Sequence, residues 1–597
     1  MESEGKNEEL DVEQTPANTP HSKPLTQNDP SDQRERVMSF RAEARTGSGA
    51  SPSSHSSLLT PHSQPFFYSI IIFIIAFVLL NVTGKRIPLC WDEGDSLWRA
   101  EQIELWLGLK DAPASAKPTA DSLPYITYSE GHPAFYGILA ASGDVLGRFV
   151  PDAGFRTLFY LFYAFAIAAV FGKLLRRYPT TIAPSMIAAS SMILIPRLYC
   201  HAHFAVNDSI LTSCWVLAWV FFTEEEKPRS VWHAIPFGFF WGLTMASKFT
   251  GWLAIPCFAA VWLFHRNCKL FLYLLAGFVV AALTFYIVNP PLWSNPIGGM
   301  CEFFSRNLGR EETFNLTGYF FGRLYNVTYS LPWYNTTVWI LITIPVGILA
   351  LVFLGFGELW RNRQMLFIQS LILNAAVLPI VRALPHVPAH DNERLFITAF
   401  AFLAIIAGVG TLTLKRLLSR LPEFRRRFVY VSLISVVFLG SLSSWIIYAP
   451  HWLSYYNLTV GGLPGAYRLG LEPTYWWTDL DDSVLNWINE NSQPGEKVQF
   501  QLCSRYNLNI LIREKKLRVN YASAAPGRYR WYVMQTRPSV MNKRDWHFAQ
   551  TQTPAHTVTI PFSGTGPWNL SSVPLIRIYD LNAYSEEEGG EKPLRGN

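Results

Sequence analysis

The chain has 597 residues and a formal net charge of +6. Half of its residues are hydrophobic and only 16% are charged, against roughly a quarter in soluble domains. The hydrophobic residues form runs of roughly 16–22 residues between charged connectors, which is typical of bilayer-spanning helices and excludes an ordinary soluble domain. The basic residues form no stripe with interleaved aromatics, so no nucleic acid partner is expected, and the 7 cysteines form no CxxC motif, so no cysteine metal site is expected.

The N-terminal residues 1–65 are rich in Ser, Pro, Thr, Asn and Gln and poor in large apolar side chains. Such a segment cannot bury enough apolar surface to offset the entropy lost on ordering, so we expect a disordered cytoplasmic tail. The first apolar run, Phe66 to Val82, follows this tail and is interpreted as a signal anchor that stays in the membrane.

The next region, residues 66–447, is predicted as a transmembrane domain of about 11 spans. With the N-terminus in the cytoplasm, every inner connector carries Lys or Arg, as the positive-inside rule requires. The predicted fold class is therefore an all-α polytopic transmembrane protein, integral to the membrane and in contact with its lipids. The expected spans lie approximately at 66–83, 155–174, 181–196, 206–223, 231–247, 249–265, 270–288, 336–356, 366–384, 395–414 and 428–447.

The same alternation of sides places long segments on the outer face: residues 84–154, 289–335 and 448–597. In the first outer loop, Leu97 to Leu109 and His132 to Val150 are amphipathic and are predicted as interfacial helices.

The C-terminal segment 448–597 has a different character. Alternating runs at 497–502 and 575–579 predict strands, and the pattern from Asp481 to Asn491 predicts a helix. We therefore expect a small extracytoplasmic α/β domain, periplasmic or lumenal.

An acidic turn follows the first span, in Trp91-Asp92-Glu93-Gly94-Asp95. Carboxylates this close repel one another when ionised, so they need a metal ion, a hydroxyl donor or a raised pKa on one of them. A general base for group transfer and a divalent cation site are the functional interpretations, and ordinary solvated loop acids are the alternative. The sequence leaves the question of a metal ion open.

Further ionisable residues gather where the third expected span ends and the fourth begins: Arg197, His201, His203 and Asp208. Ionisable groups at membrane depth are costly and usually face a functional cavity. The alternative is that each is a helix cap or interface anchor, Asp208 in particular as the cap of the fourth span.

Lys248 and Arg394 add two cations on the same side. Lys248 lies between two spans, against the positive-inside bias, and needs a local anion unless it snorkels to lipid headgroups. Arg394 begins a span, where its guanidinium offers a fixed fork of donors to a phosphate unless it pairs with Asp391 or Glu393. Together these groups predict one outer-facing pocket with a base, cations for a phosphate and a hydrophobic surround, suited to a lipid-linked phosphosugar.

These motifs, in this order, resemble the C-type glycosyltransferases that use polyprenyl-phosphate sugars, specifically the protein O-mannosyltransferase, aminoarabinose transferase and RgtA-like group. The resemblance runs from about residue 66 to 480 and does not cover the segment after it. The motifs that carry it are Asp92-Glu93, Gly131-His132-Pro133-Ala134-Phe135-Tyr136, His201-Ala202-His203 with Asp208, Ser247-Lys248-Phe249-Thr250-Gly251, Glu393-Arg394-Leu395-Phe396, and Ser454-Tyr455-Tyr456-Asn457 with Gly461-Gly462.

The resemblance implies the C-type architecture and an inverting transfer. A mannose-like or other hexose or pentose would pass from a polyprenyl-phosphate donor to a hydroxyl on a protein, glycan or lipid acceptor at the outer face. Asp92 would act as general base or orient the acceptor, with Glu93 in support. No cofactor is assigned, and a divalent metal ion stays open, with His203 and Asp208 either lining the cavity or holding the ion. The resemblance assigns substrate binding to five residues, of which the two cations would contact the donor phosphate: Lys248, Arg394, His203, Asp208 and His132.

Two other classes of protein compete with this interpretation. A transporter or flippase of a lipid-linked sugar would place ionisable groups on both sides of the bilayer midplane, whereas here they favour the outer ends of the spans. A non-catalytic membrane scaffold would leave Asp92 without a role. The sequence identifies neither the sugar nor the acceptor.

Overall fold

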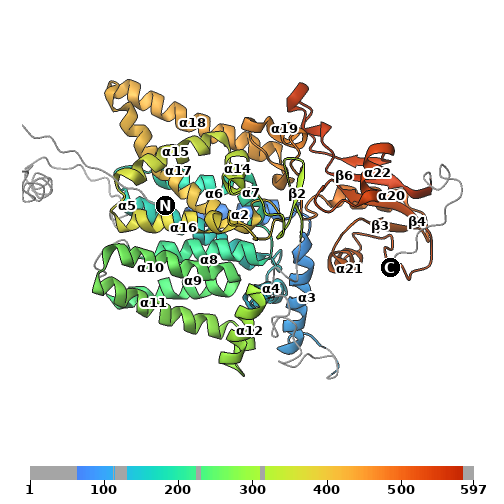
Figure 1. The fold of residues 1–597 in the computed structure, drawn as a ribbon, viewed down its shortest axis with the longest axis horizontal. Coiled ribbons are helices and arrows are strands. Elements are labelled where there is room, and N and C mark those ends of the chain that lie inside the picture. The colour runs from blue at the N-terminus through green and yellow to red at the C-terminus, as the bar shows by residue number, and fades with distance from the viewer. Residues whose placement is uncertain (1–63, 112, 114–130, 224–229, 310–315, 583–597) are drawn as a thin grey trace, which may run out of the picture. The chain divides into compact units, whose positions relative to one another are not determined.

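The computed structural model describes residues 64–111, 113, 131–223, 230–309 and 316–582, and the statements below concern these residues. The expected tail 1–65 lies outside them except for its last two positions. Helices stand at each expected span position: α2 (Gln64–Gly84), α5 (Thr157–Arg177), α6 (Ala183–Leu194), α8 (Asn207–Phe221), α9 (Ala234–Ser247), α10 (Ala254–His265), α11 (Cys268–Ile287), α14 (Asn335–Thr343) with α15 (Val346–Arg361), α16 (Leu366–Arg382), α17 (Thr398–Leu417) and α18 (Glu423–Ile447). Figure 1 shows α9, α10 and α11 running side by side.

Within the described residues, 5 helices are long and apolar enough to cross a membrane, judged by length and composition. Two of them bury little of their most apolar stretch inside the protein, 11% for Pro65–Gly84 and 6% for Glu423–Ile447. Their exposed apolar side chains therefore suit contact with lipid. The other three are Thr157–Arg177, Cys268–Ile287 and Thr398–Arg420.

The segment expected as one span, 336–356, consists of two helices in the structure, because the helix breaks between α14 and α15. Pro345 has no N–H to continue the ladder of hydrogen bonds and disfavours a helical conformation at Ile344 before it. The side-chain amide of Asn457 compensates by donating to the carbonyls of Leu341 and Ile344, both at 2.7 Å. Asn457, which belongs to one of the sequence motifs, thus bonds to carbonyl groups at the helix break.

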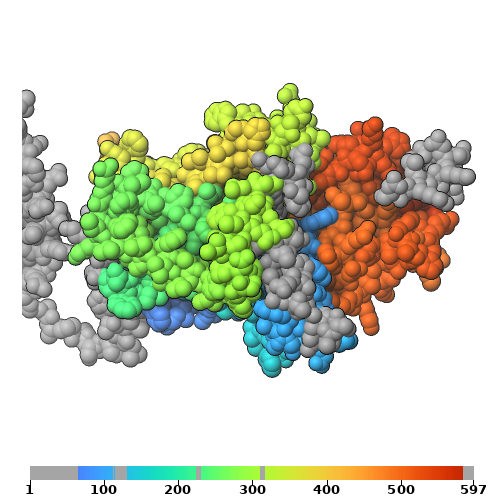
Figure 2. Space-filling view, turned by 60° about the horizontal axis from the view of Figure 1, so that its bottom comes forward, coloured from blue at the N-terminus to red at the C-terminus, as the bar shows by residue number. Residues whose placement is uncertain are grey.

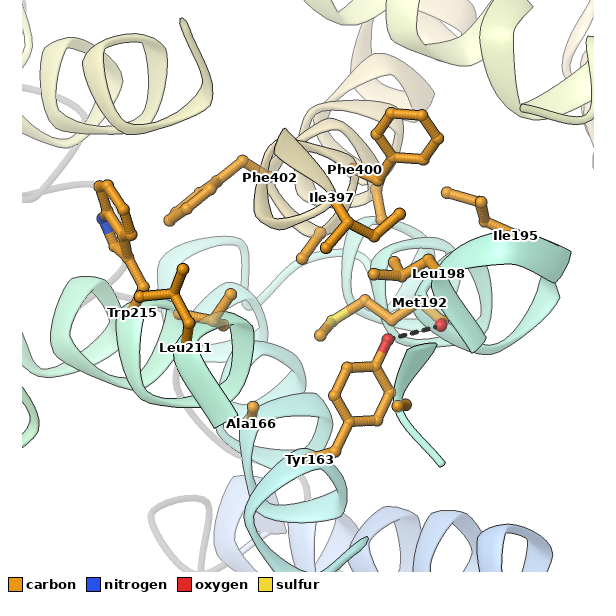
Figure 3. Close-up of a cluster of buried hydrophobic side chains, with 14 of the residues drawn as sticks. Tyr163, Ala166, Met192, Ile195, Leu198, Leu211, Trp215, Ile397, Phe400 and Phe402 are labelled. Carbon is orange, nitrogen blue, oxygen red and sulfur yellow. Dashed lines mark hydrogen bonds between the residues drawn. The ribbon is translucent and has the colours of Figure 1, made fainter. Parts of the chain in front are cut away.

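The main hydrophobic core lies where α5, α6, α8 and α17 meet (Figure 3). Trp215 of α8 and Phe402 of α17 are both fully enclosed, and the Tyr163 hydroxyl donates to the carbonyl of Met192 at 2.9 Å. Beside this core, α15 packs closely against α17. A Cβ on Gly410 would lie 1.9 Å from the Leu351 carbonyl oxygen, so only glycine permits this approach.

The acidic segment predicted as a loop turn forms the N-terminal end of a helix, α3 (Trp91–Trp106). The expected interfacial helix at Leu97–Leu109 therefore begins six residues early, because Glu93 accepts from the backbone N–H of Cys90 at 3.0 Å and closes the N-terminal end. The second expected interfacial helix, His132–Val150, is shorter and runs as α4 (Phe135–Gly147). The helix α12 (Pro296–Leu308) and the hairpin of β1 (Gly318–Phe320) and β2 (Arg323–Tyr325) follow in the second outer loop.

The C-terminal region holds the predicted strands and helix. Its sheet has the order β3-β4-β6-β5, formed by β3 (Lys497–Phe500), β4 (Tyr529–Gln535), β5 (His556–Val558) and β6 (Ile576–Asp580). Only the β3–β4 pair is parallel. Helices α20 (Asp482–Asn491), α21 (Arg505–Arg513) and α22 (Lys543–Thr551) accompany it. The predicted fold class, an all-α transmembrane part with a small α/β part at the C-terminus, is confirmed.

The C-terminal region packs directly on the start of α3 (Figure 2). Asn507 of α21 donates to the Cys90 carbonyl at 2.8 Å, and the Trp91 N–H donates to the Trp476 carbonyl at 2.9 Å. A Cβ on Gly94 would lie 2.2 Å from the Asn507 side-chain oxygen. The glycine within the acidic motif therefore makes room for α21.

Candidate active site

A cavity of about 580 Å³ lies between α3, the start of α8, the end of α16 and the loop before α17. Loops of the C-terminal region complete its wall. Part of the wall is apolar and part is charged. The apolar side chains include Phe249, Leu378, Val381, Val387, Pro388, Leu395 and Val540, and the charged ones are Asp92, Asp95, Lys248, Arg382, Asp391, Arg394 and Arg537.

Arg394 is the centre of the charged wall. It follows the end of a loop and begins a short 3-10 turn that leads into α17, as expected from the sequence. Its guanidinium is ion-paired with Asp92, with Asp208 at 2.9 Å and with Asp391 at 2.6 Å. It also lies 3.9 Å from the centre of the Trp476 ring. The predicted alternative, a pair with Asp391, is therefore present together with a contact to Asp92, which lies 302 positions away in the sequence.

Lys248, the C-cap residue of α9, has the local anion that its position requires. Its Nζ lies 2.6 Å from Oδ1 of Asp208. Asp208 is not the cap of α8, contrary to the alternative considered above, because Val206 is the N-cap and Asp208 lies inside the first turn. Asp208 therefore joins Lys248 to Arg394.

Arg537, from the loop after β4, extends this network. Its Nη2 lies 2.6 Å from Oδ1 of Asp391. Burial raises the pKa of Asp391, but Arg537 and Arg394 lower it further, so the net pKa lies well below its usual range and the carboxylate stays ionised. The C-terminal region thus contributes a charge to the cavity wall.

Arg382 differs from these cations. It is the last residue of α16, is 3% exposed and lines the cavity. None of its three guanidinium nitrogens has a hydrogen-bond partner among the described residues. A buried cation without partners is costly unless a ligand supplies an anion. Beside it, burial lowers the pKa of His390 to about 3, so this imidazole is neutral and adds no competing charge.

The acids of α3 face different surroundings. Asp92 accepts from Trp476 Nε1 at 3.2 Å through one oxygen and contacts Arg394 through the other. Asp95 is half-buried on the cavity wall and has no hydrogen bond or ion pair within the described residues. Burial, reinforced by Asp92, raises the pKa of Asp95 to about 6.

Glu93 lies away from the cavity. Its carboxylate is fully buried and bound by Arg156 through Nε at 2.7 Å and Nη2 at 2.6 Å, and it also accepts from the Ala205 N–H at 2.9 Å. Both oxygens are therefore occupied by protein donors. A metal ion between Asp92 and Glu93, which the sequence left open, does not fit these residues, and the described residues contain no group of three or more His, Cys, Asp or Glu that could hold one.

The two histidines predicted to bind substrate also lie in different places, one on the cavity wall and one away from it. His132 lines the cavity, and its Nδ1 lies 3.3 Å from the Asn207 side chain. His203 is fully buried, with Nε2 2.8 Å from the Thr83 hydroxyl and Nδ1 2.8 Å from the Tyr199 carbonyl, and it is not part of the described cavity wall. Of the predicted site residues, the structure gathers Asp92, Lys248, Arg394, His132 and Asp208 and leaves Glu93 and His203 outside.

The sequence analysis missed Arg382, Arg537 and Trp476. Arg382 carried a usable signal, since it stands at the end of an apolar run where an isolated cation is costly. Arg537 and Trp476 carried none, because only the packing of the C-terminal region on the membrane helices brings them to the cavity.

No protein-family model matches the chain, and no curated protein is similar to it in sequence. Several solved structures are similar. ArnT from Cupriavidus metallidurans in the apo state is 14% identical, with a TM-score of 0.46 over 86% of this chain and 98% of that chain. ArnT bound to undecaprenyl phosphate is 13% identical, with a TM-score of 0.45 over the same shares.

A third structure is the oligosaccharyltransferase AglB from Archaeoglobus fulgidus, in complex with an inhibitory peptide and a dolichol-phosphate. It is 13% identical, with a TM-score of 0.40 over 79% of this chain and 69% of that chain. ArnT is an aminoarabinose transferase, one of the groups that the sequence motifs resemble. At these identities and TM-scores no residue role passes from one protein to another, so the roles proposed below rest on the geometry of this chain.

Proposed function

We propose that this protein is a membrane glycosyltransferase that moves a sugar from a polyprenyl-phosphate donor to a hydroxyl acceptor with inversion. The observation that carries the proposal is the buried, unpartnered guanidinium of Arg382 on the wall of a cavity that is otherwise partly apolar. An anion joined to a long apolar group satisfies both parts of this wall.

The phosphate end of the donor fits the cations. Arg382 offers a complete set of guanidinium donors, whereas Lys248 and Arg394 are already neutralised in part by Asp208. A phosphate bound to Arg382 would also feel the field of these two neighbours on the same wall. As the bond to the sugar breaks, negative charge grows on the phosphate, and fixed cations stabilise that charge.

The polyprenyl chain fits the apolar wall. Leu378 and Val381 precede Arg382 on α16, and Val387 and Leu395 continue the apolar surface on the following loop and turn. An isoprenoid placed there would remove apolar surface from water on both partners, at roughly 25 cal/mol per Å² buried.

The acceptor end fits the acids of α3. In a single displacement, the bond from the acceptor oxygen to the anomeric carbon forms while the bond from that carbon to the phosphate oxygen breaks, which inverts the anomeric centre. The phosphate leaves with the bonding electron pair, and a carboxylate takes the proton of the acceptor. Asp92, fixed by Arg394 and Trp476, is suited to orient the acceptor hydroxyl.

The proposed reaction takes place on the outer side of the membrane. With the N-terminus in the cytoplasm, the basic connectors face inward and the cavity faces outward, together with residues 448–597. In this arrangement residues 66–447 form the transmembrane glycosyltransferase domain and residues 448–597 the extracytoplasmic domain.

The test is a release assay that needs no knowledge of the acceptor. The protein in lipid nanodiscs is incubated with dolichyl- or undecaprenyl-phosphate-linked hexoses and pentoses, and liberated polyprenyl phosphate is measured with and without hydroxyl acceptors. We expect release or transfer with at least one sugar. We also expect polyprenyl phosphate to inhibit far more strongly than the uncharged polyprenol.

The matched variants are Arg382→Gln at the cavity and Arg323→Gln on the exposed strand β2. Arg382→Gln should lose the preference for the phosphate over the alcohol, and Arg323→Gln should keep it. Movement of the intact lipid-linked sugar across the bilayer without release would overturn the proposal in favour of a flippase.

A further inference from the structure

Two carboxylates of α3 share the cavity wall. Asp92 and Asp95 are three positions apart, so they lie on one face of the helix, whereas Glu93 between them points away and is buried against Arg156. Gly94, the remaining residue of the motif, packs against Asn507. The helix therefore presents two acids to any bound acceptor.

These two acids differ in what already holds them. Both oxygens of Asp92 are engaged by protein donors, one by the Arg394 guanidinium and one by the Trp476 indole. Neither oxygen of Asp95 has a hydrogen bond or ion pair among the described residues. An ion pair with a guanidinium stabilises the charged carboxylate and weakens it as a base, so the freer acid is better placed to take a proton.

We propose that Asp95 is the group that removes the proton from the acceptor hydroxyl, and that Asp92 is a positioning residue that holds Arg394 and the acceptor. This inference rests on the proposed glycosyl transfer, and it resolves the two roles left open for Asp92 in favour of orientation. It also makes Asp95, three residues after Asp92, a catalytic residue of the reaction.

The acceptor oxygen forms its bond to the anomeric carbon and gives its proton to the Asp95 carboxylate. The carbon–oxygen bond to the phosphate breaks, and the polyprenyl phosphate keeps the electron pair against Arg382. After the product leaves, the Asp95 carboxyl returns its proton to water through the cavity, which restores the starting state.

The surroundings of Asp95 support this assignment. Burial raises its pKa to about 6, which lets it be ionised near neutral pH and still compete for a proton in the transition state. On its own helix, Asp92 raises the pKa and Arg99 lowers it. The titratable and charged groups that face it across the cavity from other elements are His132, Tyr136, Lys248, Arg382, His390, Asp391, Arg394 and Arg537.

The first measurement is the pH profile of kcat/KM for the release or transfer reaction. A base must be ionised to act, so the wild-type rate should fall as the pH drops through about 6, the pKa of Asp95. Asp95→Asn should lower kcat/KM by roughly 100- to 10,000-fold and abolish this acid limb, while Asp95→Glu should recover part of the rate with a limb at a changed pH.

The second measurement separates catalysis from structure. Asp95→Asn should bind polyprenyl phosphate as the wild type does, because it leaves the Arg394 network intact. Asp92→Asn should weaken that binding, because it releases one of the carboxylates that hold Arg394, and should keep the acid limb at a lower pH, because Asp92 raises the pKa of Asp95. The control on the same helix is Glu101→Gln, whose partners Lys110 and Arg513 are both exposed, and it should behave as the wild type.

The outcomes distinguish the two proposals. An active wild type together with full activity and an unchanged acid limb in Asp95→Asn would overturn the assignment of the base alone. Loss of the acid limb in Asp92→Asn, with the limb retained in Asp95→Asn, would also overturn it and return the role to Asp92. A wild type that neither transfers nor releases any sugar would overturn the proposed function, and this inference with it.

Discussion

Two buried arginines differ in whether protein groups bond to their guanidinium nitrogens. Arg197 lies 2.6 Å from Glu393 and donates to the Tyr455 carbonyl at 2.9 Å, and the Tyr475 hydroxyl donates to the same glutamate. Arg382 is almost as deeply enclosed but has no such partner among the described residues. Burial is common to both, so the presence or absence of a protein partner is the informative difference.

The same contrast recurs within one turn of α3. Glu93 is enclosed and bound by Arg156 and two backbone N–H groups, including that of Ala205. Asp95, two residues later, lines the cavity without a partner within the described chain. Neighbouring acids of one motif thus serve the fold and the site respectively.

The largest effect on stability is expected from breaking the buried ion pair of Glu93 and Arg156. Glu93→Gln leaves Arg156 buried without a counter-charge, and removing one partner of a buried pair costs about 3–5 kcal/mol of stability. We expect a strongly lowered unfolding midpoint in detergent, with Glu101→Gln at a half-buried position of the same helix as control. An unchanged midpoint together with lost activity would instead make Glu93 a functional acid, as the sequence suggested.

Arg382→Met should act in the opposite direction. It removes a buried cation that lacks partners, so the free energy of unfolding of the ligand-free protein should rise by about 1–3 kcal/mol. Polyprenyl phosphate should then stabilise the wild type but not the variant. Chemical denaturation with and without the lipid measures both quantities, and Arg197→Met provides the destabilised comparison. If Arg382→Met were less stable than the wild type, its guanidinium would have a structural partner after all.

Asp95→Asn offers a smaller effect that depends on pH. The folded pKa of about 6 lies above the ordinary value of 3.8, so ionisation of Asp95 destabilises the fold as the pH rises between these values. At pH 7 the variant should be more stable, on the order of 1 kcal/mol after allowance for solvent screening. The gain should shrink from pH 6 downward and vanish below about pH 4. A constant difference across this range would contradict the raised pKa.

The smallest effect is expected at the surface. Lys85 and Asp152 form an exposed pair at 3.1 Å, and Asp152→Asn should change stability by less than about 1 kcal/mol, because solvent screens such pairs. Asn also tolerates the left-handed backbone at this position, where φ is 63°. Thermal unfolding at low and high salt checks this, and a loss of several kcal/mol would show that exposed pairs here behave like the buried ones.

Much of the fold was predictable because its signals are local. Apolar runs placed a helix at every expected span, and the alternating pattern at 497–502 predicted the strand β3. Local signals failed where distant residues decide. Asn457 bonds to the carbonyls at the Pro345 break, and the start of α3, capped locally by Glu93, is also held by Trp476 and Asn507.

The residues of the candidate site were also predictable only in part. Lys248 and Arg394 stood out because isolated cations on the outer side conflict with the positive-inside bias or with membrane depth. Glu93 was predicted to have a supporting role beside Asp92, whereas the structure places its carboxylate away from the cavity and bound by Arg156. Adjacent acids look alike in a sequence, and only their neighbours distinguish them.

The sequence by itself determined that this is a membrane protein and that acids and cations gather at one end of its helices, because hydrophobic runs and charge bias are properties of contiguous segments. Only the tertiary structure decided which charged side chains have bonding partners within the protein. Asp92 and Arg394 meet across 302 positions, and the Arg382 guanidinium has no hydrogen bond among the described residues. Pairing and burial are set by contacts between distant segments, and those contacts turn an acidic motif into one structural acid and two acids that face a cavity.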